Sequence, residues 1–172
     1  MKRQKFLQEL RELLPRFGKD NIIYFDESGF EAHTYRDSGW ALRGVKIFGD
    51  VAGKREKRTN LIMAQQGKGK TVNWLAPMIF KGSCTAQTVE AWISRFLLKE
   101  LKNPTIVIMD NASFHNKKRL KEILAKEGHY LLPLPPYSPD LNPIENTFGG
   151  MKKRRKGMHK NTTIDELVMS YY

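Results

Sequence analysis

The chain has 172 residues, of which 40% are hydrophobic and 28% charged, and it contains one cysteine. This length suits one domain with a proper core rather than two, and the lone Cys84 excludes an intramolecular disulfide and a thiolate metal cluster. The 30 basic residues outnumber the 18 acidic ones, and the formal net charge of +12 indicates a polyanionic partner, either nucleic acid or an anionic membrane surface.

The sequence carries no predicted membrane or export segment. No apolar run approaches the roughly 18 residues that a transmembrane helix needs. The amino terminus MKRQKFLQEL is charged throughout and lacks the apolar centre of a signal peptide. We therefore expect an intracellular, cytoplasmic protein with no membrane partner, and nucleic acid as the polyanion.

The first half of the sequence predicts one helix followed by strands. Apolar residues recur at helical spacing from Phe6 to Leu14, and we expect Pro15 to end this amphipathic helix, which need not belong to the core. The run NIIYFDES predicts a buried strand because it is apolar, β-branched and closed by polar residues.

Three further stretches are strand-like. Residues 40–51 and 59–66 keep a strand-like pattern, with KREKR between them as an exposed turn. Residues 74–80 are apolar but contain Pro77, which predicts an edge strand or a loop.

The second half alternates helices and strands. In order, the pattern predicts a helix over 85–101, a strand TIVIMD, a helix over 117–126, a strand HYLLPLP, a proline-rich loop PPYSPDLNP and a last helical region from about Ile144. Early strands joined by short turns should be antiparallel, and later ones separated by helices should be parallel through right-handed crossovers. The prediction is an α/β fold with a mixed sheet flanked by helices.

Three carboxylates stand at the ends of these elements. Asp26 belongs to the first strand, Asp110 closes TIVIMD, and Glu145 lies near the start of the last helix. If the first and fourth strands are neighbours, both aspartates project from the same end of the sheet. Carboxylates brought together repel one another, and a divalent cation with a preference for oxygen ligands, Mg²⁺ or Mn²⁺, relieves that repulsion. Two such ions support in-line phosphoryl transfer.

Each carboxylate also has a structural explanation. Asp110 would serve equally as the cap of the next helix, and Glu145, which follows Pro143, would favour the helix dipole. Asp26 is next to Glu27; strand alternation sends the two side chains to opposite faces, and we choose Asp26 as the ligand.

Four stretches of this sequence resemble the bacterial insertion-sequence transposases of the mariner superfamily. They are FDESGF, GWALRG, IVIMDNASFH and LPPYSPDLNPIENTF, and the likeness spans about residues 20–156. It implies a ribonuclease H-like fold and assigns the metal-binding, catalytic positions to Asp26, Asp110 and Glu145. The 34 residues between Asp110 and Glu145 match the family spacing.

The resemblance extends to residues around these carboxylates. Asn111 and His115 match the DN…H pattern beside the second aspartate. This favours His115 as an orienting group near the metals over a satisfied turn residue. Trp40 and Gly44 match a Trp…Gly element. Phe148 stands where many relatives carry tryptophan and is followed by Gly149-Gly150. Two helical glycines cost about 1 kcal/mol each against alanine, which puts helix continuity there in doubt.

The resemblance also implies domains, cofactors and partners. Residues 1–19 would form an N-terminal linker helix and residues 20–172 the DDE transposase catalytic domain, binding two Mg²⁺ or Mn²⁺ ions. Relatives act as homodimers on paired double-stranded DNA ends and insert at TA dinucleotides, and we expect this chain in the bacterial cytoplasm, associated with the nucleoid. Only 25 residues precede Asp26, so we expect the DNA-recognition modules on a separate domain or second reading frame, and weak DNA binding by this chain.

Basic residues predict the DNA-binding surface. The candidates are Arg43, Lys152, Lys153, Arg154, Arg155 and Lys156, with Lys54, Arg55, Lys57 and Arg58 forming a second cluster with Arg43. Helix rise places Lys152 about 10 Å from Glu145 on nearly the same face. Such contacts set affinity and salt dependence without reading sequence.

Other residues receive structural roles. Tyr137, Pro139 and Pro143 are expected to stiffen the loop that presents Glu145, and Cys84 to be a half-buried small residue. His33, His129 and His159 are expected to be surface or core residues.

Two other functions compete with the transposase. The segment AQQGKGKT, residues 64–71, satisfies a relaxed phosphate-loop pattern, but such a loop must open a helix, and β-branched residues and Pro77 follow instead. The second alternative is a non-catalytic relative that only binds nucleic acid or a transposase partner.

Overall fold

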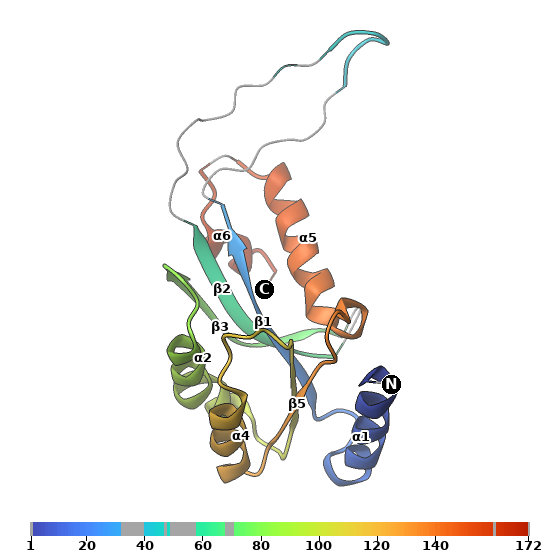
Figure 1. Cartoon of the computed structure of the whole chain (residues 1–172). Coiled ribbons are helices and arrows are strands. Elements are labelled where there is room, and N and C mark those ends of the chain that lie inside the picture. The colour runs from blue at the N-terminus through green and yellow to red at the C-terminus, as the bar shows by residue number, and fades with distance from the viewer. Residues whose placement is uncertain are drawn as a thin grey trace.

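A five-stranded mixed sheet organises the chain in a computed structural model that describes residues 2–31, 40–46, 48, 58–67, 71–159 and 161–171 (Figure 1). The strands are β1 (Ile22–Phe30), β2 (Thr59–Gln66), β3 (Asn73–Lys81), β4 (Ile106–Met109) and β5 (Tyr130–Pro133). Their order is β3-β2-β1-β4-β5. The first three pair antiparallel and β4 and β5 join parallel, which confirms the predicted mixed sheet.

Helices cover both faces of this sheet. They are α1 (Lys2–Phe17), α2 (Ala86–Trp92), the π-helical η1 (Ile93–Leu97), α3 (Leu98–Glu100), α4 (Lys117–Lys126), the 3₁₀ turn η2 (Pro139–Leu141), α5 (Pro143–Gly157) and α6 (Ile164–Met169). The segments α2, η1 and α3 follow one another without a break and form the predicted helix over 85–101. Thr85 begins it, since its side chain accepts from the Thr88 N–H.

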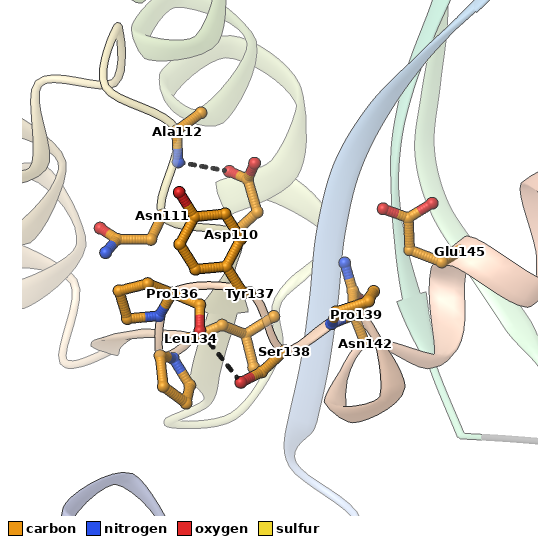
Figure 2. Close-up of a pocket in the computed structure, with 11 residues that line it drawn as sticks. Asp110, Asn111, Ala112, Leu134, Pro136, Tyr137, Ser138, Pro139, Asn142 and Glu145 are labelled. Carbon is orange, nitrogen blue, oxygen red and sulfur yellow. Dashed lines mark hydrogen bonds between the residues drawn. The ribbon is translucent and has the colours of Figure 1, made fainter. Parts of the chain in front are cut away.

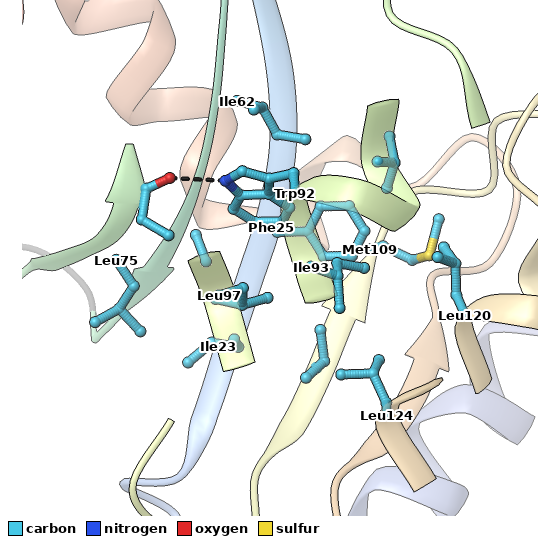
Figure 3. Packing of buried hydrophobic residues seen from close by; sticks show 14 of the residues in the cluster. Ile23, Phe25, Ile62, Leu75, Trp92, Ile93, Leu97, Met109, Leu120 and Leu124 are labelled. Carbon is cyan, nitrogen blue, oxygen red and sulfur yellow. Dashed lines mark hydrogen bonds between the residues drawn. The ribbon is translucent and has the colours of Figure 1, made fainter. Parts of the chain in front are cut away.

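The core forms one apolar layer on each face of the sheet. Phe25 of β1 packs on Trp92 at a ring-centroid distance of 5.5 Å, within the cluster that joins the sheet to α2, η1 and α4 (Figure 3). On the opposite face, α5 and α6 pack on β1 and β2 through Phe148 and Leu167. Because β1 alternates its side chains between the two layers, consecutive residues of this central strand serve different faces.

The amino-terminal helix packs against the sheet. Phe6 and Phe17 of α1 are buried with Ile106, Ile108 and Leu132, so α1 covers β4 and β5. The expectation that Pro15 ends this helix is wrong, because Pro15 lies inside α1, which continues to Phe17.

Pro77 lies in an edge strand, as predicted. The register of β2 and β3 shifts between Ile62 and Ala64, and the facing Ala76 has a left-handed φ of +49°. Its backbone is held by side chains: the Ala76 N–H donates to Glu100 Oε1 at 3.0 Å and its carbonyl accepts from Trp92 Nε1 at 2.7 Å. Side chains of the 86–100 helix thus stabilise the irregularity at the proline.

The strand predicted over residues 40–51 is wrong. Residues 40–46 and 48, the described part of the predicted 40–51 strand, form no strand, and Trp40, Leu42, Val45 and Phe48 are exposed. The strand-like sequence pattern is therefore not sufficient here, because no other strand pairs with this segment in the described part of the chain. The structure also argues against the phosphate-loop alternative, which the sequence already disfavoured, because Ala64 lies inside β2 and the described chain after residue 71 enters β3 rather than a helix.

The two glycines near the carboxyl terminus do not interrupt their helix. Gly149 and Gly150 both lie inside the continuous α5, so the doubt about helix continuity is resolved. Ile144, Phe148 and Met151 fill one buried face of α5, and this packing outweighs the low helix propensity of the glycines.

Candidate active site

The parallel pairing of β1 and β4 brings the two aspartates to one end of the sheet. Phe25 is in register with Met109, so Asp26 and Asp110 are the next residues on these neighbouring strands. Asp26 is only 7% exposed, because it faces the layer beneath α5. Asp110 lies just beyond the end of β4. The predicted adjacency of the first and fourth strands is confirmed.

Asn142 holds Asp26 in place. Asp26 Oδ1 accepts from the Glu27 backbone N–H at 2.8 Å, and Oδ2 accepts from Asn142 Nδ2 at 3.1 Å. Asn142 precedes Pro143, the first residue of α5, a position that proline favours. One amide therefore joins the first aspartate to the start of the helix that carries Glu145.

His115 joins Asp110 to Glu27. Its Nε2 lies 3.2 Å from Asp110 Oδ1 and 3.8 Å from Glu27 Oε1, and its side chain is completely buried. Asp110 Oδ1 also accepts from the Ala112 N–H at 3.2 Å. Asn116 caps α4 by accepting from the Arg119 N–H and thereby closes the turn that presents His115. The predicted proximity of His115 to the second aspartate is thus present in the structure.

Glu145 and Asp110 line one cleft of about 400 Å³ (Figure 2). Glu145 lies in the first turn of α5, where its N–H donates to the Asn142 carbonyl at 3.2 Å. Asn111, Asn142 and the proline-rich loop form other walls. Asp26 does not line the cleft, but it accepts a hydrogen bond from Asn142, which does.

Burial, mutual repulsion and local contacts shift the pKa values of these acids in different directions. Burial raises the pKa of Asp26 to about 8, and the charge of Glu27 adds to the effect, followed by those of Asp110 and Glu145. Burial also raises the pKa of Glu27. Burial acts in the same direction on Asp110, but the close contact with His115 and the hydrogen bond from the Ala112 N–H outweigh it and leave its pKa lowered.

These acids have the chemistry of a site for a hard divalent cation. A cation among them would remove both the mutual repulsion and the desolvation cost of Asp26. Across the described ranges, no three histidine, cysteine, aspartate or glutamate side chains converge closely enough to enclose an ion. The oxygen donors of these acids suit a hard cation by their chemistry, while the assignment of Asp26, Asp110 and Glu145 as its ligands stays a prediction.

The predicted DNA-binding residues differ in their surroundings. Arg43, Lys152, Lys153, Arg154 and Lys156 are exposed. Arg155 is only 6% exposed and its guanidinium donates to the Glu31 carbonyl, so it ties α5 to the end of β1 and its surroundings do not support a DNA contact. Lys54, Arg55 and Lys57 lie outside the described residues.

Sequence reasoning missed Asn142 and the contact between Glu27 and His115. The position of Asn142 before a helix-initiating proline was visible, but its partner Asp26 is 116 residues away. His129 is buried and its Nδ1 accepts from the Thr105 N–H at 3.2 Å, and His159 is exposed, which agrees with the core and surface roles expected; His33 lies outside the described residues. Tyr137, expected to stiffen the loop, exposes its whole ring.

Comparison with known families decides the relationship of the chain. The family description "DDE superfamily endonuclease" matches residues 21–168, a range that contains all five strands of the sheet. The chain belongs to the DDE superfamily of endonucleases. No curated protein sequence matches it significantly.

Solved structures similar to this DDE-superfamily chain share its fold. The mariner Mos1 paired-end complex with Mg has a TM-score of 0.75 at 18% identity, over 98% of this chain and 53% of that one. The Mos1 transposase paired-end complex with the left transposon end has a TM-score of 0.68 at 20% identity, over 89% and 47%.

The Mos1 catalytic domain with Raltegravir and Mg gives a TM-score of 0.60 at 17% identity, over 99% of this chain and 80% of that one. The ribonuclease H-like architecture is confirmed by this likeness. The chain spans about half the length of the Mos1 chains in the paired-end complexes. In the described part of the DDE chain, no helix is both long and apolar enough to cross a membrane.

Proposed function

We propose that the chain is the catalytic domain of a DNA transposase of the mariner superfamily, encoded by a bacterial insertion sequence, that cleaves and rejoins DNA strands. The observation that carries the proposal is the placement of Asp26 and Asp110 on neighbouring strands, with Glu145 on the same cleft as Asp110. Membership of the DDE endonuclease superfamily gives this acidic group its chemical context.

The carboxylates of Asp26, Asp110 and Glu145 would hold Mg²⁺ or Mn²⁺, with two ions expected. Bound divalent ions activate an attacking water or 3′-hydroxyl and stabilise the leaving oxygen of a phosphodiester. His115 positions Asp110, and Asn142 positions Asp26. Mos1 paired-end complexes are described with Mn and with Mg, which supports the choice of metal.

The proposed partner is double-stranded DNA, at transposon ends and target. Mos1 structures are described as a paired-end complex and a strand transfer complex, and from this we infer a homodimer on paired ends in the bacterial nucleoid. Residues 1–19 and 20–172 are proposed as linker helix and catalytic domain. End recognition would come from a separate domain or second reading frame. Exposed Arg43, Lys152, Lys153, Arg154 and Lys156 are the proposed phosphate contacts.

A plasmid-nicking assay tests this function. Supercoiled plasmid is incubated with Mg²⁺ or with EDTA, and the wild-type chain is compared with Asp110→Asn and with Asp165→Asn, an exposed carboxylate on α6. We expect nicking by the wild type and Asp165→Asn only with Mg²⁺, and a loss of at least about 100-fold in Asp110→Asn, the scale seen when one transition-state stabilising group is removed. Equal behaviour of all three proteins would favour the alternative, a non-catalytic nucleic-acid-binding fragment.

A further inference from the structure

A second cavity is lined in part by Glu27 and shares no lining residue with the cleft of Asp110 and Glu145. Its volume is about 860 Å³. Glu27 and Gly29 of β1, Arg58 and Lys81 at the ends of β2 and β3, and Phe114 after β4 contribute to its walls. It therefore opens where three strands end, next to the proposed catalytic group.

The cavity carries two cations. Arg58 and Lys81 are both exposed, and within the ranges that the structure describes neither forms an ion pair. The carboxylate of Glu27 faces the same cavity but lies 3.8 Å from His115 Nε2. Two cations on one wall suit a phosphodiester, and an arginine guanidinium matches phosphate oxygens with two parallel donors.

Gly29 gives Arg58 its position. A methyl group at residue 29 would lie 1.4 Å from Arg58 Nε and 2.0 Å from Arg58 Cζ, so the guanidinium occupies the space of the missing side chain. Gly29 is in register with Asn60 inside the β1–β2 ladder, and its backbone is ordinary strand. Glycine at this position thus lets the Arg58 side chain lie across β1.

Phe114 offers a ring to the same cavity. It is 40% exposed, and its ring centroid lies 4.1 Å from that of His115, at 41°. Since His115 contacts Asp110, the ring lies close to the proposed metal site. An exposed aromatic face beside phosphate-binding cations is how proteins hold single-stranded nucleic acid, because every unpaired base can stack on it.

We propose that this cavity binds one unpaired nucleotide of a DNA strand, with its phosphate on Arg58 and Lys81 and its base on Phe114. The proposal rests on the function above only in taking DNA as the ligand. It gives the domain a place to hold a displaced strand beside the acids that cut it.

Fluorescence anisotropy in EDTA tests the cavity without cleavage. The probe is a labelled single-stranded DNA oligonucleotide of mixed sequence, alone and annealed to its complement, titrated at several salt concentrations. The variants are Arg58→Ala, Gly29→Ala and Phe114→Ala, with Arg11→Ala, an exposed arginine on α1, as the matched charge control.

We expect Arg58→Ala and Gly29→Ala each to lower the salt slope for the single strand by about 0.7, the contribution of one phosphate contact. Phe114→Ala should weaken single-strand binding about fivefold or more, with a smaller loss for the duplex, and Arg11→Ala should change little. Gly29→Ala is decisive, because it keeps every charge and displaces the guanidinium.

Wild-type affinity of Gly29→Ala together with weaker binding by Arg58→Ala would overturn the proposal, because Arg58 would then act only as surface charge. Equal losses on single strand and duplex would also overturn it. Since no cleavage is measured, these outcomes are separate from a failure of the nicking assay.

Discussion

At the scale of single residues, Tyr137 combines backbone strain with full exposure. Its φ is +55°, its side chain is 102% exposed, and it lines the cleft of Asp110 and Glu145. A left-handed non-glycine residue costs on the order of 1 kcal/mol or more, and such strain persists mainly where the side chain has a role. The ring itself contributes little packing that would repay this cost.

Replacing Tyr137 by asparagine should therefore stabilise the protein and harm its function. Asparagine tolerates the left-handed conformation, so we expect the free energy of unfolding to rise by about 1 kcal/mol and plasmid nicking to fall. Urea denaturation and the nicking assay measure the two effects. Tyr137→Phe keeps the strain and the ring and should match the wild type in both; a Tyr137→Asn protein that is no more stable than Tyr137→Phe would contradict the argument.

His129 makes stability depend on pH from the other end of the sheet. Burial lowers its pKa, and its Nδ1 must be unprotonated to accept from the Thr105 N–H. A lowered pKa means that the unfolded chain binds the proton more readily, so this histidine's contribution is complete above about pH 6.5 and is lost as pH falls below it. Wild type should lose more stability than His129→Gln between pH 7.5 and 5.5, measured by chemical denaturation; parallel curves would exclude this role.

At the scale of elements, α5 shows how packing overrides propensity. Added Cβ atoms at Gly149 and Gly150 would meet nothing within 4 Å, and both glycines are exposed. The double variant Gly149→Ala/Gly150→Ala should raise the free energy of unfolding by about 2 kcal/mol, one for each glycine, as measured by the urea midpoint. Gly67→Ala provides the contrast: its φ is +79° and its Cβ would lie 2.1 Å from the Thr71 carbonyl oxygen, so it should destabilise.

Comparing the predicted with the observed elements shows which features a local sequence pattern can predict. The period of Leu120 and Leu124 and the cap Asn116 are local, and the helix predicted over 117–126 coincides with α4. A short sequence pattern does not reveal whether a segment is buried or which strand it pairs with. For this reason the pattern predicts a strand at residues 40–46, where the structure has none. The same division applies to the site. The acids are recognisable from motifs, whereas the hydrogen bond from Asn142 to Asp26 and the contacts of His115 with Asp110 and Glu27 exist only once the chain is folded.

At the scale of the whole molecule, the acids at the centre of the sheet destabilise the folded state when they are ionised. Burial and the charges of Glu27, Asp110 and Glu145 raise the pKa of Asp26 to about 8. The folded chain therefore binds a proton that the unfolded chain releases near its ordinary pKa of 3.8. Between these two pKa values the folded state binds more protons than the unfolded state. The free energy of unfolding is therefore highest at low pH and declines as pH rises toward 8.

Metal-free protein should thus lose stability between pH 5 and pH 8, in the direction opposite to the effect of His129. Asp26→Asn should flatten the decline, since the amide cannot ionise, and Mg²⁺ should raise the melting temperature of the wild type at pH 8 more than at pH 5, because bound cation stabilises only the folded state and competes with protons. Asp165→Asn should keep both responses. Two null results together would contradict this argument: a melting temperature that Mg²⁺ does not change at pH 8, and a stability that does not change with pH. They would mean that these acids do not interact electrostatically, and the proposed metal site would lose its physical basis.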